Sequence, residues 1–442
     1  MIYENYDPSF PDQPVVDLYL PVWANLPSFR SKPGFIWAED GSNGAAKSST
    51  IIYAQLNESA HSISTRLLTQ LQRGDTVVIL CSPGLELVQI IFGCHRAGLL
   101  CIPMFPPDPS FTKENHHHLV RVLSQTKPKA AIAQHDYIAR KLTWISTSDI
   151  KDKKGSSNMG SLPYNGCRPN ELYLIQYTSG ATVIPKPVMV TAGAAAHNVR
   201  VARKAYDLYP NTVIVSWLPR YLDCGVQFLL LTIISGATSV LTSGAFWAKP
   251  IMHFSILSSY GLAENGTFVS TAWRGNCSNG ESFPHIPSHN KLLPCARLAS
   301  QREEEEDMDI IVVDEDTCEL VVDGMEGEIW VSSPSNYSGY LGHPSITREI
   351  FQARLREQGD GPGKIQRWAA KDMLIRDKMS VVMEMQFEDN NARFFPSFEA
   401  TEQVKFLKIE IKKSPRHFQA LQGAPHCFLS CEKNISWLLV FE

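Results

Sequence analysis

One segment of the 442-residue chain combines hydroxyl, glycine and lysine residues at a spacing suited to phosphate binding. The apolar run Leu172–Tyr177 leads into Thr178-Ser179-Gly180-Ala181-Thr182, and Lys186 follows four residues later. Hydroxyl and backbone N–H groups donate to phosphate oxygens, and a lysine offsets the charge of the outer phosphates. The spacing differs from that of a Walker loop. Taken alone, the segment suits a phosphate loop and a plain polar strand-to-helix turn equally well.

A second segment could hold the rest of a nucleotide. It reads Tyr260-Gly261-Leu262-Ala263-Glu264-Asn265. An aromatic residue followed by glycine can stack on a base or ribose, and a carboxylate a few residues later can hold Mg²⁺ against phosphates. The two segments together favour a site for a magnesium nucleotide.

The elements that must position these segments follow a pattern of alternating strands and helices. Helices are expected over 53–71, 85–98 and 194–208, and strands over 76–81, 99–103, 129–133, 171–177, 212–217, 236–241, 310–313, 319–322 and 328–331. Strand, helix and strand in a short stretch indicate a parallel sheet, whose ligands bind at the carboxyl ends of its strands. We therefore predict a doubly wound α/β domain over about 17–241 and antiparallel strands from about Asp309 onward. The first fifty residues suggest an extended lead-in, and no core is predicted beyond Gly359.

Composition excludes several classes of protein. Apolar residues make up 44% of the chain and charged residues 19%, which favours a globular core over disorder. The net charge of −4 argues against a nucleic-acid partner held mainly by phosphate contacts. Polar residues interrupt the longest apolar run, 228–241, so no transmembrane segment is expected. The polar start and cysteines such as Cys81, Cys94, Cys101 and Cys224 suggest a cytoplasmic protein with buried thiols. His116-His117-His118 is interpreted as a solvated helix start, not a metal site.

Several motifs of the chain resemble those of the adenylate-forming enzymes. Residues 177–191 resemble their phosphate loop, and residues 260–265 resemble their adenine and magnesium motif. Residues 217–225, Trp-Leu-Pro-Arg-Tyr-Leu-Asp-Cys-Gly, resemble the Trp-Leu-Pro-x-Tyr-His-Asp-x-Gly of the fatty-acyl-AMP ligase branch. Residues 327–331 with Ser338-Gly339-Tyr340 resemble the later β subdomain. The motifs follow family order from about Asp17 to Leu355, and the chain most resembles plant members of the branch.

This resemblance implies ATP-dependent activation of a fatty-acid carboxylate. The acyl-adenylate would form with release of pyrophosphate, and the acyl group would then pass to an acyl carrier protein or to CoA. The implied cofactors are ATP/AMP and Mg²⁺, with Lys186 and Glu264 as catalytic residues and Glu264 as the metal ligand. The implied nucleotide-binding residues are Thr178, Ser179, Gly180, Ala181, Thr182, Lys186, Tyr260 and Gly261.

Departures from the family's pattern predict an impaired ligase. The usual loop glycine is Val183, the usual histidine before Asp223 is Leu222, and only residues 246–259 stand where the family has a long stretch lining the acyl pocket. The Thr-Gly-Asp triplet expected after Phe351 and the C-terminal catalytic lysine are not recognisable. We therefore expect a truncated or exon-skipped product with reduced or absent activity.

The expected organisation has three parts. An α/β AMP-binding region, with the doubly wound parallel-sheet subdomains of the adenylate-forming N-terminal domain, covers 1–300. A small antiparallel β subdomain covers 301–355, and a degenerate or truncated C-terminal region covers 356–442. Two other interpretations stay open: a non-catalytic remnant that binds nucleotide or a partner, and a chain that does not fold stably. The intact side chains from Thr178 to Lys186 favour the enzyme, whereas the missing pocket and lysine favour the remnant.

Overall fold

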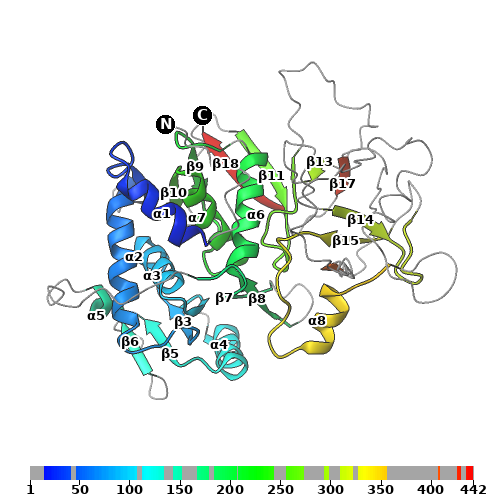
Figure 1. The fold of residues 1–442 in the computed structure, drawn as a ribbon, viewed down its shortest axis with the longest axis horizontal. Helices are drawn as coiled ribbons and strands as arrows, with labels where there is room; N and C mark the ends of the chain where they lie inside the picture. The colour runs from blue at the N-terminus through cyan, green and yellow to red at the C-terminus, as the bar shows by residue number, and fades with distance from the viewer. Residues whose placement is uncertain are drawn as a thin grey trace, which may run out of the picture.

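The fold is given by a computed structural model (Figure 1). It describes residues 14–40, 46–106, 112–133, 143–151, 167–178, 184–206, 208–242, 255–272, 293–297, 309–321 and 327–355 and the strands 407–408, 426–429 and 435–441. These residues form sheets of six, nine and three strands, with helices packed around them. None of the helices in this described part of the chain is long and apolar enough to cross a membrane.

The six-stranded sheet has the strand order β6-β5-β3-β4-β7-β8. Its strands are β3 (Thr76–Leu80), β4 (Leu100–Pro103), β5 (Ala130–Ala133), β6 (Thr143–Ser146), β7 (Leu172–Tyr177) and β8 (Pro187–Thr191). All neighbouring strands are parallel except β7 and β8, which form an antiparallel hairpin. The segment between β7 and β8 is therefore a strand-to-strand turn and not the strand-to-helix turn considered above.

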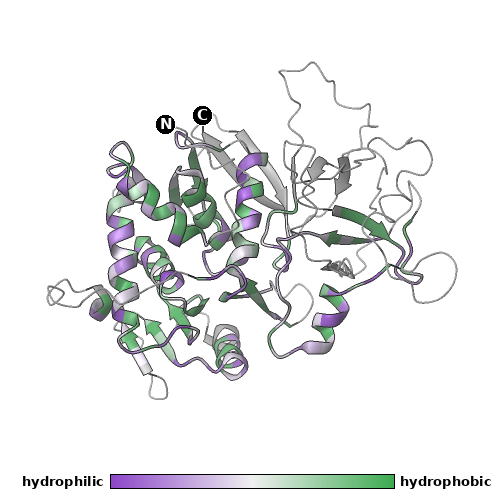
Figure 2. Ribbon diagram, viewed as in Figure 1, coloured by the Kyte–Doolittle hydropathy of each residue, from purple (hydrophilic) through white to green (hydrophobic). Residues whose placement is uncertain are grey.

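Helices cover both faces of this sheet. Successive residues of β3 point to opposite faces, and each set packs against different helices. Val77 and Ile79 pack into the core that contains α2 (Tyr53–Leu67) and α3 (Leu85–Arg96). Val78 and Leu80 pack instead against α4 (Thr112–Thr126). Figure 2 shows the resulting concentration of apolar residues in the strands. The predicted doubly wound α/β fold is confirmed.

The nine-stranded sheet has the order β17-β13-β12-β11-β18-β9-β10-β1-β2. Its strands are β1 (Pro33–Asp40), β2 (Ala46–Ile52), β9 (Val213–Ser216), β10 (Thr238–Thr242), β11 (Ser255–Tyr260), β12 (Ser270–Ala272), β13 (Leu293–Arg297), β17 (His426–Leu429) and β18 (Ile435–Phe441). The pairs β1–β10 and β10–β9 are parallel, and the other pairs are antiparallel. Antiparallel pairs therefore occur well before Asp309, in the hairpins β1–β2 and β7–β8 and again from β11 onward.

The C-terminal strand β18 lies between β11 and β9 and pairs with both. The sequence predicts no strand in this segment, and the structure adds one. Its apolar residues Ile435–Phe441 add a strand between two others that would each have an open edge without it.

The first fifty residues are also different from the expected extended lead-in. Helix α1 (Val15–Asn25) contains Pro21, yet its residues Val16, Leu20 and Trp23 are almost fully buried at helical spacing. The Trp23 indole Nε1 donates to the Ile233 backbone oxygen at 2.7 Å. Burial of this face outweighs the hydrogen bond that the proline removes, and β1 and β2 follow as a hairpin.

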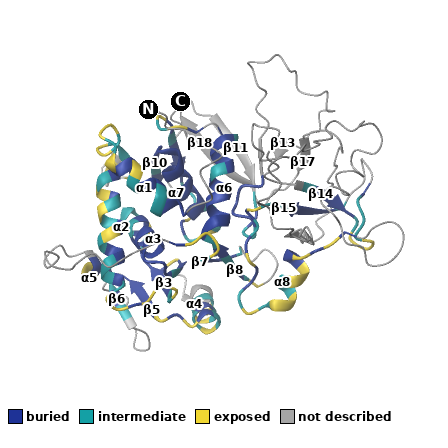
Figure 3. Ribbon diagram, in the orientation of Figure 1, coloured by how far each residue is buried: buried dark blue, intermediate teal, exposed yellow. Residues whose placement is uncertain are grey.

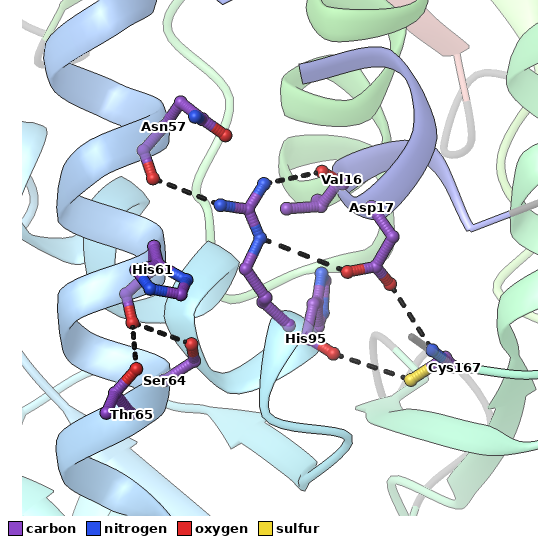
Figure 4. Close-up of polar contacts among 9 residues, drawn as sticks. Val16, Asp17, Asn57, His61, Ser64, Thr65, His95 and Cys167 are labelled. Atoms are coloured by element: carbon purple, nitrogen blue, oxygen red, sulfur yellow. Dashed lines mark hydrogen bonds and ion pairs between the residues drawn. The ribbon is translucent and has the colours of Figure 1, made fainter. Parts of the chain in front are cut away.

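Arg96, at the end of α3, forms hydrogen bonds to both α1 and α2. Figure 4 shows these bonds as dashed lines to the labelled Val16 and Asn57. The Arg96 guanidinium donates to the backbone oxygens of Val16 and Asn57, each at 3.0 Å. Its Nε lies 3.9 Å from Oδ1 of Asp17. A buried guanidinium is costly unless its donors are satisfied, so this contact set fixes how α1 packs on the domain.

The three-stranded sheet contains β14 (Asp309–Val313), β15 (Glu328–Ser332) and β16 (Leu407–Lys408) in that order. The expected strand over 319–322 is reduced to an isolated bridge between Val313 and Leu320. Asp314 Oδ1 accepts from the backbone N–H groups of Asp316 and Thr317, which closes a turn just before that point. Helix α8 (Pro344–Phe351) follows β15 and has four of its eight residues exposed, whereas α6 (Ala192–Ala205) and α7 (Asp223–Ser235) are buried almost throughout (Figure 3).

Candidate active site

The predicted phosphate loop connects the adjacent ends of β7 and β8. The Thr178 backbone N–H donates to the Lys186 carbonyl, and the Lys186 N–H donates to the Thr178 hydroxyl, both at 3.0 Å. Thr178 and Lys186 therefore lie face to face at the neck of the loop. Ser179, Gly180, Ala181, Thr182 and Val183 lie outside the described residues. The structure thus places the two ends of the loop and leaves its tip as a prediction.

A buried amide lies two residues before the loop. Gln176, in β7, is 1% exposed, and neither polar atom of its side-chain amide has a hydrogen-bond partner within the described residues. A buried amide without partners costs free energy, so such a group signals a polar ligand or water nearby. Sequence reasoning passed over Gln176 because it lies inside an apolar strand.

The segment after the third sheet runs beside β8 and extends its hydrogen bonding. The Met189 N–H donates to the Gly339 carbonyl at 2.8 Å, and the Ser338 N–H donates to the Met189 carbonyl at 3.1 Å. Tyr340 forms an isolated antiparallel bridge with Val188. This pairing brings Tyr340 next to Lys186, although 154 residues separate them in the sequence.

The second predicted segment forms a tight loop after β11. The N–H groups of Asn265 and Thr267 both donate to the Leu262 carbonyl at 3.1 Å. A Cβ at Gly261 would lie 1.3 Å from the Thr267 carbonyl oxygen, so only glycine fits there. Thr267 has a φ of +87°, which β-branched residues rarely adopt and which is typical of functional loops.

Helix α6 holds this loop in place through hydrogen bonds from one buried side chain. The Asn198 amide nitrogen donates to the carbonyls of Asn265 and Phe268 at 3.0 and 2.9 Å, and its oxygen accepts from the Phe268 N–H at 3.3 Å. The sequence contains one usable signal for this role, an asparagine in an alanine-rich helix, and the structure shows that this residue is fully buried.

The two predicted segments meet through Tyr340. The Tyr340 hydroxyl donates to Glu264 Oε1 at 2.6 Å, and the Lys186 ammonium lies 5.1 Å from the centre of the Tyr340 ring. Lys186 and Glu264, predicted from separate motifs, therefore share one neighbouring side chain. Tyr260 lies at the end of β11, where its backbone pairs with Ser270 and Ile435.

A second carboxylate lies near Glu264. Asp223 begins α7 within the motif 217–225, and its Oδ2 accepts from the Thr267 hydroxyl at 3.2 Å. Burial raises the pKa of Glu264, and Asp223 raises it further, while the Tyr340 hydrogen bond and Lys186 oppose the change. Burial likewise raises the pKa of Asp223. A cation placed here would stabilise both carboxylates in the charged form.

The side chains of the site are of the kinds that could bind a nucleotide and a metal ion. Lys186 and the Thr178 hydroxyl suit phosphate oxygens, Glu264 supplies the hard oxygen ligand that Mg²⁺ prefers, and Gly261 leaves its loop without a side chain. No group of three or more His, Cys, Asp or Glu residues that could hold a metal unaided occurs in the described ranges.

Comparisons with known proteins identify related sequences. The sequence model of the family described as AMP-binding enzyme matches residues 29–254, just over half of the chain. The medium-chain-fatty-acid–[acyl-carrier-protein] ligase JamA of Moorena producens is 24% identical over 426 residues, which cover 72% of this chain and 69% of JamA. The putative fatty-acid–CoA ligase fadD25 of Mycobacterium tuberculosis is 28% identical over 233 residues, 48% of this chain and 39% of the relative.

Solved structures show the same fold. A fatty acyl-adenylate ligase from Legionella pneumophila, solved in complex with acyl adenylate and pyrophosphate, matches with a TM-score of 0.63 at 21% identity. The match covers 79% of this chain and 73% of that structure. The likeness shows that the chain and this ligase share a fold.

Proposed function

Because the chain belongs to the AMP-binding enzyme family, we propose that it binds ATP with Mg²⁺ and activates a fatty-acid carboxylate as an acyl-adenylate. The observation that carries the proposal is the meeting of Lys186 and Glu264 on the two sides of Tyr340. The names of the relatives support a fatty acid as the substrate and an acyl carrier protein or CoA as the acceptor.

Each predicted residue takes a role that its position suits. Residues 178–182 and Lys186 would bind the phosphates, and Tyr260 and Gly261 would contact the adenosine. Glu264 would hold Mg²⁺, which when bound neutralises phosphate charge. In the proposed reaction a carboxylate oxygen bonds to the α-phosphorus, the bond from that phosphorus to the bridging oxygen breaks, and pyrophosphate leaves with the electron pair. The protein contributes position and charge, which are the main sources of rate in such a displacement.

We also propose that this chain turns over slowly. The connection between β10 and β11 contains only residues 243–254, where the family's pattern predicts a long stretch lining the acyl pocket. Binding energy from the acyl chain then cannot be used to orient the carboxylate. Val183→Gly alone should leave the rate low, whereas insertion of the family's missing stretch should raise it. Fast turnover by the unmodified chain would contradict this part of the proposal.

The same short connection favours a second candidate function. A chain that keeps Thr178, Lys186 and Glu264 but lacks the pocket could bind nucleotide, or a partner, without turnover. The two candidates differ in one measurable respect: only the ligase forms pyrophosphate in response to a fatty acid.

Calorimetric titration of the purified chain with ATP and Mg²⁺ tests the nucleotide site. Lys186→Ala should weaken ATP binding at least tenfold, because a hydrogen bond between charged groups contributes about 1.5–3 kcal/mol. Lys47→Ala removes the same charge from the exposed edge strand β2 and should leave the affinity unchanged. Equal ATP affinity in the Lys186 variant would show that the phosphates bind elsewhere.

A further inference from the structure

Tyr340 contacts both charged residues of the candidate site, yet none of the motif residues above assigns it a role. Its hydroxyl donates to Glu264 at 2.6 Å, and its ring faces the Lys186 ammonium at 5.1 Å. One side chain therefore joins the group suited to the metal and the group suited to the phosphates.

The position of Tyr340 is well fixed by its neighbours. It is 4% exposed, its N–H donates to the Thr347 hydroxyl at 2.9 Å, and its ring packs edge-on against Phe351 with centroids 5.2 Å apart. Gly339, just before it, has a φ of +127°, and a Cβ there would lie 2.2 Å from the Thr347 side chain. A rigid tyrosine can hold its two contacts in place without the entropy cost that a mobile side chain would carry.

We propose that Tyr340 is a positioning residue for the magnesium nucleotide, which orients Glu264 through its hydroxyl and Lys186 through its ring. The inference rests on the proposed function and extends it to a residue to which the motifs assign no role. The hydroxyl donates to Oε1 of Glu264 and so fixes the orientation of the carboxylate that would hold the cation. The ring holds the ammonium by a weak cation–π contact, which phosphate oxygens can replace at little cost.

The two contacts predict different effects for two substitutions. Tyr340→Phe removes only the hydroxyl, so the affinity for the metal should fall about tenfold while the affinity for metal-free ATP changes less than twofold. Tyr340→Leu removes the ring as well. The opposite charges of Lys186 and Glu264 are then free to move together, and the affinities for both metal and metal-free ATP should fall.

The experiment uses the full chain and Mn²⁺ as a paramagnetic probe for Mg²⁺. ATP affinity is measured by calorimetry in EDTA, and Mn²⁺ affinity of the ATP complex by electron paramagnetic resonance. Tyr53→Phe is the matched control, because it also removes a buried tyrosine hydroxyl. Tyr53 lies in α2, and its hydroxyl donates to the Ala237 carbonyl at 2.6 Å. A thermal melt of each variant checks folding, and Tyr340→Phe keeps the test valid if Tyr340→Leu does not fold.

A double-substitution cycle shows whether Tyr340 acts through Glu264. Tyr340→Phe should weaken Mn²⁺ binding in the wild-type chain and have no further effect in a Glu264→Gln chain. Additive effects in the two backgrounds, or equal losses in Tyr340→Phe and Tyr53→Phe, would overturn the inference. If Lys186→Ala leaves ATP affinity unchanged, the proposed function fails. If Lys186→Ala weakens ATP binding but Tyr340→Phe leaves Mn²⁺ affinity unchanged, only the role of Tyr340 is refuted.

Discussion

His95 should make the chain less stable in mild acid. The residue lies in the last turn of α3, is 1% exposed, and packs its ring against that of Tyr173 with centroids 4.2 Å apart. Its backbone oxygen accepts from the Cys167 thiol at 3.4 Å (Figure 4). Burial lowers the pKa of His95 from 6.5 to about 3.

The direction of the effect follows from the two pKa values. Between pH 6.5 and pH 3 the unfolded chain binds a proton at this position and the folded chain does not. The free energy of unfolding therefore decreases as pH falls through this window. At pH 5, which is 1.5 units below the unfolded value, the loss is about 2 kcal/mol, or roughly a thirtyfold change in the folding equilibrium.

Urea unfolding at pH 7 and pH 5 measures this loss. His95→Gln has no titrating group at the position, so the difference in unfolding free energy between the two pH values should shrink by about 2 kcal/mol relative to wild type. His61→Gln, on the exposed side of α2, is the matched control. An unchanged pH difference in the His95 variant would show that this imidazole is not held neutral by burial.

Two further substitutions and one deletion test the fold and the site. Gly261→Ala should abolish ATP binding in calorimetry, because its Cβ would lie 1.3 Å from the Thr267 carbonyl and force the loop apart; retained affinity would refute the loop geometry. Asp17→Asn should lower the urea unfolding free energy by about 3 kcal/mol, since Arg96 keeps a buried charge without its carboxylate; a loss below 1 kcal/mol would contradict that reading. Deletion of residues 435–441 opens the edges of two strands and should produce oligomers in light scattering, whereas a monomer would contradict the pairing of β18.

Much of the α/β region could be predicted from local sequence. The run Thr76–Leu80 is apolar at successive positions, which only a strand buried on both faces requires, and α2 and α3 follow from helical spacing of apolar residues. Of the thiols expected to be buried, Cys81, Cys94 and Cys101 are buried, and Cys224 is half-buried. These features depend on neighbours within a few residues.

Features that depend on distant parts of the chain could not be predicted in this way. Helix α1 was missed because Pro21 and its aromatic residues resemble a loop until the packing partner, the end of α7, is known. The motifs gave Thr178, Lys186 and Glu264, but nothing in them indicates that Tyr340 lies between the last two. The role of Asn198 likewise depends on a loop 67 residues later.

ATP–pyrophosphate exchange by the purified 442-residue chain tests the proposed activation of a fatty acid most directly. The reaction is run with dodecanoate, with a shorter acid and without acid, alongside the Lys186→Ala and Glu264→Gln variants. We predict slow exchange that requires the acid and is lost in both variants. The absence of any acid-dependent exchange from a chain that still binds ATP would contradict the ligase function and leave the non-catalytic nucleotide-binding protein in its place.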